Sequence, residues 1–363
     1  MRALISSSAT GGHIYPALAI ADEIMLRDSA AEVLFVSAKW ERWEVGTDIV
    51  GSAGYRQAFV DVLGFDRKNL FANIGVLIGL VRASGEIKKI LKEFKPDVCI
   101  GTGGHISGLV IRAAKKAGIR TVIEEQNVIP GMANKLAEKY ADRVFVGFKE
   151  AVQYFKNPDK IIVSGNPVRT AFAEAAARRA EIRERLGIND KTFCVLFVGG
   201  SQGADAINMA AACTVRELGG HEGYHFIVIT GGRDFNVRQS GAALLSGVVV
   251  IKYADAIYEL YAAADLIVAR AGALTVAEIA ESGKASVLIP SPNVTNNHQY
   301  FNAKALSDGG AAVLIPEEEL GGLSGEIKRL AADSAALEAI GRAAKAAAMP
   351  EAARVIVDEI LGS

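Results

Sequence analysis

The sequence predicts an α/β protein made of two doubly wound domains, each with a parallel sheet that helices cover on both faces. Short, mostly apolar runs alternate with amphipathic helical patterns along the 363 residues. Strands that are apolar along their whole length are buried on both faces, which is typical of parallel sheets. A chain of this length can build two domains, each with its own core. We therefore expect two Rossmann-like domains with an interdomain cleft.

The expected strands fall into two sets, one in each half of the chain. The first set comprises Ala3–Ser7, Val33–Val36, Gln57–Val60, Val98–Ile100, Thr121–Glu124, Arg143–Val146 and Ile161–Val163. The second set comprises Cys194–Val198, His225–Thr230, Val248–Ile251, Leu266–Ala269, Ala285–Ile289 and Ala312–Leu314. The segments between them have helical or loop-like patterns, as β–α units require.

The domain boundary is predicted at Gly165-Asn166-Pro167, where a strand ends and a proline follows. The first domain then spans residues 1–164 and the second spans residues 165–349. Met349-Pro350 interrupts the last helical patterns. We expect the C-terminal helix, within residues 350–363, to return to the first domain and complete it.

Composition and charge argue against several classes of protein. The chain has 40 Lys and Arg against 41 Asp and Glu, a net charge of −1, and so lacks the excess of basic residues typical of nucleic-acid binding. Cys99, Cys194 and Cys213 are few and scattered, which fits a reducing cytoplasm and not a disulfide framework. The N-terminus turns polar after Ile5, so no signal peptide is expected. No run of about 18 apolar residues is present to span a bilayer.

Three glycine-rich turns follow predicted strands and precede helical patterns. They are Thr10-Gly11-Gly12-His13, Gly101-Thr102-Gly103-Gly104 and Gly199-Gly200-Ser201-Gln202-Gly203. A strand, a glycine turn and a helix start direct backbone N–H groups at an anion. None of the turns has the dinucleotide or P-loop pattern. Tight-turn geometry alone is the alternative, but the carboxyl ends of strands are where open α/β sheets bind ligands, so we expect two phosphate-bearing ligands.

Two stretches of the second half carry further candidate residues. In Arg270–Glu278, Thr275 lies in the first turn of a helix that can bind a second anion. Glu278 lies one turn later, where a carboxylate could accept hydrogen bonds from a ribose diol; a solvated helix acid is the alternative. The polar loop Pro290–Gln299 carries amides suited to sugar hydroxyls. Its Asn296 and Asn297 could equally be helix caps.

His13 is the first candidate for a catalytic base. It lies at the start of a predicted helix, where the helix dipole disfavours the protonated imidazole and leaves a neutral ring able to accept a proton. A structural histidine is the alternative. His221 and His225 have no companion ligands, so a metal site is not expected there.

The segment Leu70–Val81 is apolar nearly all round and is flanked by Arg67, Lys68 and Arg82. It is too short to span a membrane, but an apolar helix end with basic flanks suits contact with a membrane surface. A helix buried between other elements is the alternative.

Taken together, these stretches resemble the MurG family, the UDP-N-acetylglucosamine:lipid I N-acetylglucosaminyltransferases of peptidoglycan synthesis, in glycosyltransferase family 28. The resemblance covers nearly the whole chain and rests on Thr10–Ala17, Glu125–Asn127, Gly165–Arg169, Gly199–Ala204, Arg270–Glu278 and His298-Gln299. It implies the two-domain GT-B fold. It also implies inverting transfer of GlcNAc from UDP-GlcNAc to the MurNAc 4-hydroxyl of lipid I, giving lipid II and UDP. The chain departs from the family pattern at Glu124, often His, and at His105, usually Tyr.

The resemblance also implies roles for individual residues. For UDP-GlcNAc binding these are Thr10, Gly11, Gly12, His13, Asn127, Arg169, Ser201, Gln202, Ala254, Leu274, Thr275, Glu278, His298 and Gln299. For the acceptor diphosphate they are Thr10, Gly11, Gly12, Gly103 and Gly104. The implied catalytic base is His13, with Glu125 as the alternative. The implied membrane contact is made by Leu70, Phe71, Ile74, Leu77 and Ile78.

The implied partners are UDP-GlcNAc, lipid I, the inner leaflet of the cytoplasmic membrane, and proteins of a cell-division or elongation complex. The expected location is the cytoplasmic face of the cell membrane, as a peripheral protein. No cofactor or metal is expected, because the sequence has no Asp-x-Asp, the motif with which metal-using glycosyltransferases typically hold their ion. Two alternatives stay open: a UDP-GlcNAc 2-epimerase-like isomerase, and a sugar-nucleotide-binding protein whose catalysis has decayed.

Overall fold

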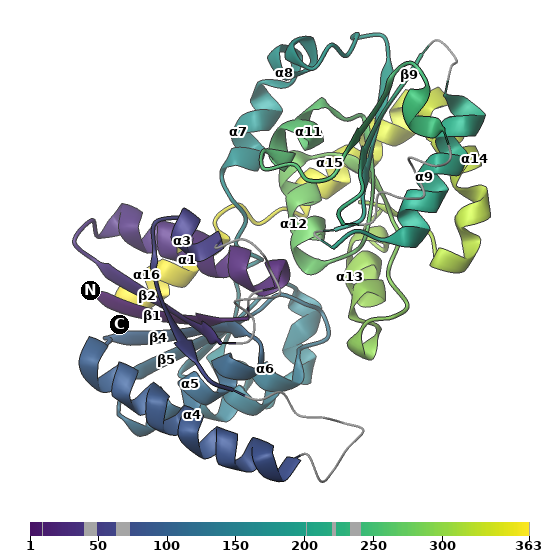
Figure 1. Ribbon diagram of the computed structural model, residues 1–363. Coiled ribbons are helices and arrows are strands. Elements are labelled where there is room, and N and C mark those ends of the chain that lie inside the picture. Colours follow the sequence, from purple (N-terminus) through teal and green to yellow (C-terminus); the bar gives the residue numbers. More distant parts are fainter. Residues whose placement is uncertain are drawn as a thin grey trace. The chain divides into compact units, whose positions relative to one another are not determined.

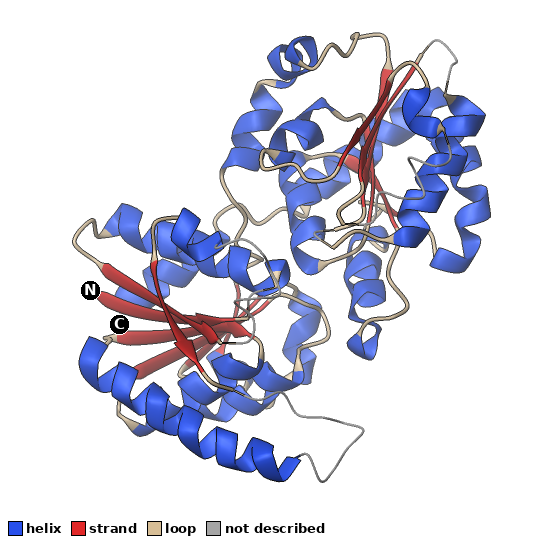
Figure 2. Ribbon diagram, viewed as in Figure 1, coloured by secondary structure: helices blue, strands red, loops and turns tan. Residues whose placement is uncertain are grey.

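The chain forms two compact units, each a parallel sheet between layers of helices (Figure 1, Figure 2). The computed structural model describes residues 1–8, 10–39, 49–62, 73–200, 202–219, 223–232 and 241–362, with the backbone alone at residues 73–78 and 243. The first unit is Met1–Pro167 together with Glu351–Ser363, and the second is Val168–Pro350. The predicted α/β class with two doubly wound sheets is confirmed.

The first unit contains a seven-stranded sheet in the order β3-β2-β1-β4-β5-β6-β7. All of its strand pairs are parallel. The strands are β1 (Arg2–Ser7), β2 (Glu32–Ala38), β3 (Arg56–Val60), β4 (Val98–Gly103), β5 (Arg120–Glu125), β6 (Arg143–Val146) and β7 (Ile161–Val163). Each strand expected in the first half of the chain overlaps one of these.

The helices of the first unit cover both faces of its sheet because successive strand side chains point to opposite sides. Leu4 packs with residues of α4 (Asn73–Phe94) and α5 (His105–Lys116) on one face. Ile5 packs with α1 (Gly11–Arg27) and α16 (Ala352–Leu361) on the other. The remaining helices are α3 (Ile49–Ser52), α6 (Met132–Ala137) and the 3-10 helices η1 (Glu138–Tyr140), η2 (Lys149–Tyr154) and η3 (Pro158–Lys160).

The second unit contains a six-stranded parallel sheet in the order β10-β9-β8-β11-β12-β13. Its strands are β8 (Phe193–Val198), β9 (Tyr224–Ile229), β10 (Val248–Ile251), β11 (Leu266–Ala269), β12 (Ala285–Leu288) and β13 (Val313–Leu314). They overlap the strands expected in the second half of the chain. The sheet therefore has the same doubly wound arrangement as the first.

The apolar faces of α9 (Asp205–Leu218) and α14 (Leu323–Ala332) pack on one side of this second sheet. Figure 1 shows α11 (Ile257–Ala263) and α12 (Ala273–Ser282) on the opposite side. The other helices are α7 (Ala171–Ala177), α8 (Arg179–Arg185), α13 (His298–Ser307), α15 (Ser334–Ala346), η4 (Ala242–Leu244), η5 (Thr295–Asn297) and η6 (Glu317–Gly322).

The C-terminal helix α16 packs against α1, so the two ends of the sequence belong to one unit. Its apolar residues Ile356, Val357 and Ile360 are buried in the same cluster as the α1 core. The guanidinium of Arg120 donates hydrogen bonds of 2.7 Å to the backbone carbonyls of Glu359 and Ile360 near the end of the helix. Cations are favoured at this end because the helix carbonyls there have no partner within the helix.

Substitution of Ile356 by Ala is expected to lower the free energy of unfolding of the first unit by about 2–5 kcal/mol, because it leaves a cavity between α1 and α16. The side chain is fully buried. Calorimetric melting measures the effect. Leu361→Ala, at a side chain that is 44% exposed, is the control and should change stability by less than about 0.5 kcal/mol. Equal effects of the two substitutions would contradict this packing.

Candidate active site

The glycine turns lie at the points where the strand order reverses in each sheet. In the first unit the order reverses between β1 and β4, and in the second between β8 and β11. The turn 10–13 follows β1, and 101–104 ends β4. The turn 199–203 follows β8, and the stretch that begins at Arg270 follows β11. Open α/β sheets bind ligands at such switch points, because the two connections diverge there.

The two turns of the first unit are in direct contact. The backbone N–H of Ser8 donates to the carbonyl of Gly103 over 3.1 Å. Gly103 has φ +118°, and a Cβ built on it would lie 2.6 Å from the His13 imidazole. Only glycine allows both this conformation and this approach. The structure therefore brings Thr10–His13 and Gly103-Gly104 together at one switch point.

The helices that start at these turns have no capping side chain. Thr10 precedes α1 and Gly104 precedes α5, and neither makes a side-chain cap hydrogen bond. Thr10 and Gly12 are exposed, and Gly11 is partly exposed. The first backbone N–H groups of a helix have no partner within it, so an uncapped start can bind an anion.

The side chain of His13 belongs to a chain of buried polar groups. Its Nδ1 lies 2.9 Å from Oε1 of Gln126. Nε2 of Gln126 donates to the carbonyl of Thr102 over 2.7 Å and also to the carboxyl group of Glu124. The hydroxyl of Thr102 donates to the carbonyl of His13 over 2.9 Å. Gln126, directly after β5, thus contacts the ring, and Thr102 on β4 binds the backbone of His13.

The two glutamates at the end of β5 have different environments. Glu124 is fully buried, and burial raises the pKa of its carboxyl well above the usual range, against the opposing hydrogen bond from Gln126. The carboxylate of Glu125 accepts from the backbone N–H groups of Asn127 and Gly131, both at 2.9 Å. It also accepts from the side-chain amides of Asn127 and Asn134. Glu125 therefore holds the loop that carries Asn127, and both of its oxygens are occupied.

In the second unit the turn after β8 is tightly folded. The N–H of Gly203 donates to the carbonyl of Gly200 over 3.0 Å. A Cβ on Gly231 would lie 2.3 Å from the nitrogen of Gly203, so the neighbouring strand connection also needs glycine there. Gln202 is exposed, and α9 starts at Asp205 without a side-chain cap. Ser201 lies outside the described residues.

The connection after β11 places a second helix start beside that turn. Helix α12 begins after Gly272 without a capping side chain, and Leu274 and Thr275 lie partly buried in its first turn. Arg270 donates to the carbonyls of Ile289 and Pro290 and pairs with Glu317. This arginine therefore joins the ends of β11 and β12 and fixes the helix start.

Glu278 lies on α12 and is partly buried. Burial raises the pKa of its carboxyl to about 7, although the positive charge of Arg169 and the hydroxyl of Tyr261 both oppose the rise. The guanidinium of Arg169 lies 5.5 Å from the ring centre of Phe172 and 5.7 Å from that of Tyr258. Stacking and charge therefore place Arg169 near Glu278.

The remaining predicted donor residues lie at other strand ends of the second unit. Ala254 follows β10 and is partly exposed. Nδ1 of His298 lies 2.9 Å from the carbonyl of Thr295 at the start of α13. Oε1 of Gln299 accepts from the N–H of Ser291 over 2.9 Å, which leaves its amide nitrogen as the group that can donate to a ligand.

The comparisons with known proteins agree with this arrangement. Models of the glycosyltransferase family 28 N-terminal and C-terminal domains match residues 4–146 and 194–356. The UDP-N-acetylglucosamine--N-acetylmuramyl-(pentapeptide) pyrophosphoryl-undecaprenol N-acetylglucosamine transferase of Halalkalibacterium halodurans is 40% identical over 358 residues, 97% of each chain. The transferase of the same name from Alkaliphilus oremlandii is 40% identical, over 89% of this chain and 87% of its own.

The chain belongs to the MurG family of glycosyltransferase family 28. The crystal structure of MurG from Acinetobacter baumannii is 26% identical, with a TM-score of 0.75 over 100% of this chain and 99% of that one. The chain is therefore a hexosyltransferase with the GT-B fold. A UDP-GlcNAc 2-epimerase from Neisseria meningitidis, at 14% identity and a TM-score of 0.71 over the whole of both chains, shares the fold alone.

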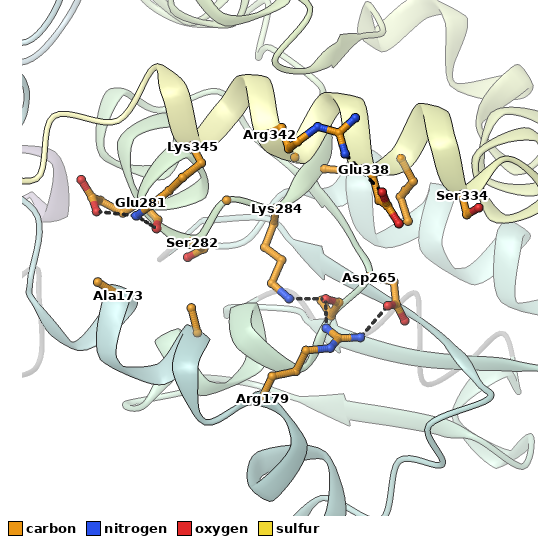
Figure 3. A pocket seen from close by; sticks show the side chains of 16 residues that line it. Ala173, Arg179, Asp265, Glu281, Ser282, Lys284, Ser334, Glu338, Arg342 and Lys345 are labelled. Carbon is orange, nitrogen blue, oxygen red and sulfur yellow. Dashed lines mark hydrogen bonds and ion pairs between the residues drawn. The ribbon is translucent and has the colours of Figure 1, made fainter.

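A cavity of about 780 Å³ in this MurG-family enzyme is lined by Asp265 and Lys284, which directly precede β11 and β12 (Figure 3). The glycine turn of the second unit follows the carboxyl end of β8, so it lies at the other edge of the parallel sheet. Its Arg179 and Lys284 donate to the carbonyls at the end of α11, and Arg179 also pairs with Asp265. Burial, with the nearby charge of Arg179, lowers the pKa of Lys284 to about 7. Lys345 reaches Glu281. None of the residues predicted to bind a substrate lines this cavity, so it is separate from the predicted site.

Sequence patterns alone did not identify three residues that lie next to the predicted site residues His13 and Glu278. Gln126 was expected only as part of a motif, whereas the structure places its amide on His13. Thr102 was expected only as a turn residue, and it contacts both Gln126 and His13. Tyr261, a buried aromatic residue, lies beside Glu278. Within the part of the chain that the structure describes, no group of three or more His, Cys, Asp or Glu is placed to hold a metal.

Glu278→Gln tests the shifted pKa through stability. Because the folded-state pKa of about 7 exceeds the ordinary value of 4.5, the folded protein holds a proton that the unfolded chain releases in that window. Stability is therefore lost as the pH rises from 4.5 to about 7. We expect the melting temperature of the variant, relative to wild type, to increase between about pH 5 and about pH 8. Glu318→Gln, at an exposed residue, is the control, and its melting temperature should follow that of the wild type at every pH. A melting-temperature difference for Glu278→Gln that does not vary with pH would contradict the raised pKa.

Proposed function

We propose that this enzyme transfers GlcNAc from UDP-GlcNAc to the 4-hydroxyl of MurNAc in lipid I, with inversion, giving lipid II and UDP in peptidoglycan synthesis. The observation that carries the proposal is the pair of uncapped helix starts at each of two switch points. Two such sites suit two diphosphate ligands. The relatives from Alkaliphilus oremlandii and Halalkalibacterium halodurans are named as transferases that act on a pyrophosphoryl-undecaprenol acceptor.

The donor is assigned to the second unit. Gln202, in the turn before α9, and Leu274-Thr275, at the start of α12, would bind the diphosphate of UDP-GlcNAc. Ser201, which precedes Gln202 in the sequence, would bind the same group. Glu278 would accept from the ribose hydroxyls, with Arg169 beside it. His298 and Gln299 at the start of α13 would meet the sugar hydroxyls, and the backbone near Ala254 would read the uracil edge.

The acceptor diphosphate is assigned to the first unit. Thr10, Gly11 and Gly12 start α1, and Gly103 and Gly104 precede α5. These uncapped starts suit the diphosphate that links MurNAc to its lipid. Asn127, which Glu125 orients, would complete the site.

His13 is the proposed base. As the acceptor oxygen bonds to C1 of GlcNAc, its proton passes to the imidazole, and the bond from C1 to the diphosphate oxygen breaks so that UDP leaves with the electron pair. The helix starts of the second unit would stabilise the negative charge on UDP. Glu125, the alternative base, is 2% exposed and its two oxygens accept several hydrogen bonds. This geometry favours His13.

Radiolabelled UDP-GlcNAc with a lipid I analogue tests the function, because the alternatives give different products. Lipid-linked disaccharide is the expected result. UDP-ManNAc formed without an acceptor, or free ManNAc and UDP where water also cleaves the sugar from the nucleotide, would instead establish the 2-epimerase activity. Binding of UDP-GlcNAc without any product would establish a binding protein that has lost catalysis.

His13→Ala is expected to lower turnover by about two to four orders of magnitude, since the variant has no proton acceptor at this position. The measurement is the initial rate of disaccharide formation at saturating substrates. Calorimetric binding of UDP-GlcNAc serves as a check that the second unit is intact. A turnover close to that of wild type would reject His13 as the base.

We also propose that the enzyme binds the inner leaflet of the cytoplasmic membrane through Leu70–Val81, where it would meet proteins of a division or elongation complex. Leu70 and Phe71 lie outside the described residues, and Ile74, Leu77 and Ile78 lie on α4, where only the backbone is described. Val81, at the end of the segment, is 75% exposed, and Arg82 beside it is exposed. No described helix is long and apolar enough to cross a membrane.

Replacing Ile74 and Leu77 together by Glu should weaken co-sedimentation with anionic lipid vesicles, because it removes apolar area and adds negative charge at the membrane surface. Turnover of a soluble acceptor should be unchanged. The control variant replaces Leu26 and Leu244, exposed elsewhere, by Glu and adds the same charge. Equal vesicle binding by the two variants would contradict the docking surface.

A further inference from the structure

The amide of Gln126 can have only one orientation. Its side chain is 1% exposed, and Nε2 lies 2.7 Å from the carbonyl oxygen of Thr102. A backbone carbonyl only accepts hydrogen bonds, so the amide NH₂ must face it. The flipped amide would place oxygen against oxygen at this distance. The hydrogen-bond partners therefore determine the orientation of the amide.

This orientation determines which nitrogen of His13 carries the proton. With its NH₂ directed at Thr102, Gln126 presents Oε1 to Nδ1 of His13 over 2.9 Å. An amide oxygen only accepts, so Nδ1 must be the donor. In the neutral imidazole, Nε2 then has the lone pair. We propose that Gln126 is a positioning residue that holds His13 in the Nδ1–H tautomer and leaves Nε2 as the proton acceptor.

The surroundings hold Gln126 and His13 in this geometry. Asn166 donates to the backbone carbonyl of Gln126 over 3.0 Å. The hydroxyl of Thr102 binds the carbonyl of His13, and Gly103 leaves no room for the ring to move toward β4. Thr102 therefore orients the amide with its carbonyl and the start of α1 with its hydroxyl.

Two titratable groups on β5, Glu124 and Glu125, immediately precede Gln126 in the chain. Glu124 accepts from Gln126, and burial raises the pKa of its carboxyl well above the usual range. Glu125 is occupied by its own loop. The direct partner of Nδ1 is therefore a neutral amide. An amide orients the imidazole without the full charge by which a carboxylate would stabilise the imidazolium.

This role rests on the proposed function of His13 as base, but it has a spectroscopic test of its own. The chain has five histidines, so nitrogen-15 histidine labelling gives few signals, and His13→Ala identifies the one from His13. Above the pH at which His13 loses its charge, we expect a protonated Nδ1 and an unprotonated Nε2. In Gln126→Ala the neutral ring should shift toward the Nε2–H form.

The kinetic expectation for Gln126→Ala is a fall in kcat of about 10–100-fold with the KM for UDP-GlcNAc nearly unchanged, because the base has its lone pair on the wrong nitrogen. Asn134→Ala is the matched control. It removes another buried amide that binds Glu124 and Glu125 but leaves Gln126 in place, so the His13 signals should keep the Nδ1–H form.

Three results would overturn the role of Gln126: an Nε2–H form in the wild type, a wild-type tautomer in Gln126→Ala, or a changed tautomer with unchanged kcat. The wild-type spectrum alone decides the first, even if Gln126→Ala does not fold. If the wild type formed no lipid-linked disaccharide, the proposed function would fail while the spectrum still determined the tautomer.

Discussion

Both units depend on one constraint. In a parallel sheet, the carboxyl ends of all strands lie at the same edge of the sheet. The connections diverge only where the strand order reverses, between β1 and β4 and between β8 and β11. Uncapped helix starts meet at both reversals. Backbone N–H groups that the helices cannot satisfy are thereby concentrated at two places. An enzyme that binds two diphosphates can bind one at each of these places.

At the two edges of the second sheet, the backbone groups at the helix ends have different partners. At the edge opposite the glycine turns, Arg179, Arg183 and Lys284 donate to backbone carbonyls at the end of α11. There the carbonyls without a helical partner are satisfied by cations of the protein itself. At the edge with the glycine turn, the N–H groups at the starts of α9 and α12 receive no capping side chain. The end of α11 is therefore stabilised by side chains of the protein, whereas the starts of α9 and α12 have backbone N–H groups that can bind a ligand.

The first unit has buried polar side chains near the switch point of its sheet. Among the described residues, the hydroxyls of Ser6, Ser7 and Ser107 and one carboxyl oxygen of Glu124 are buried without a hydrogen-bond partner. All lie at or near the ends of β1, β4 and β5, close to His13. Buried polar groups without partners cost stability. These groups lie at the switch point, where the predicted site needs polar atoms, and they lower the stability of the fold there. Glu278 of the second unit is a similar case, because burial raises the pKa of its carboxyl.

The sequence by itself determined the elements and where each glycine turn follows a strand, because apolar runs and turn residues are local patterns. It also showed the family, since the motifs occur in one order along the chain. It could not determine which strands are neighbours, and therefore which turns meet. The contact between His13 and Gln126 joins residues 113 positions apart, and the environment of Glu278 depends on Arg169 and Tyr261. Tautomers, pKa shifts and helix-end partners arise from contacts between distant segments, so only the tertiary structure decided them.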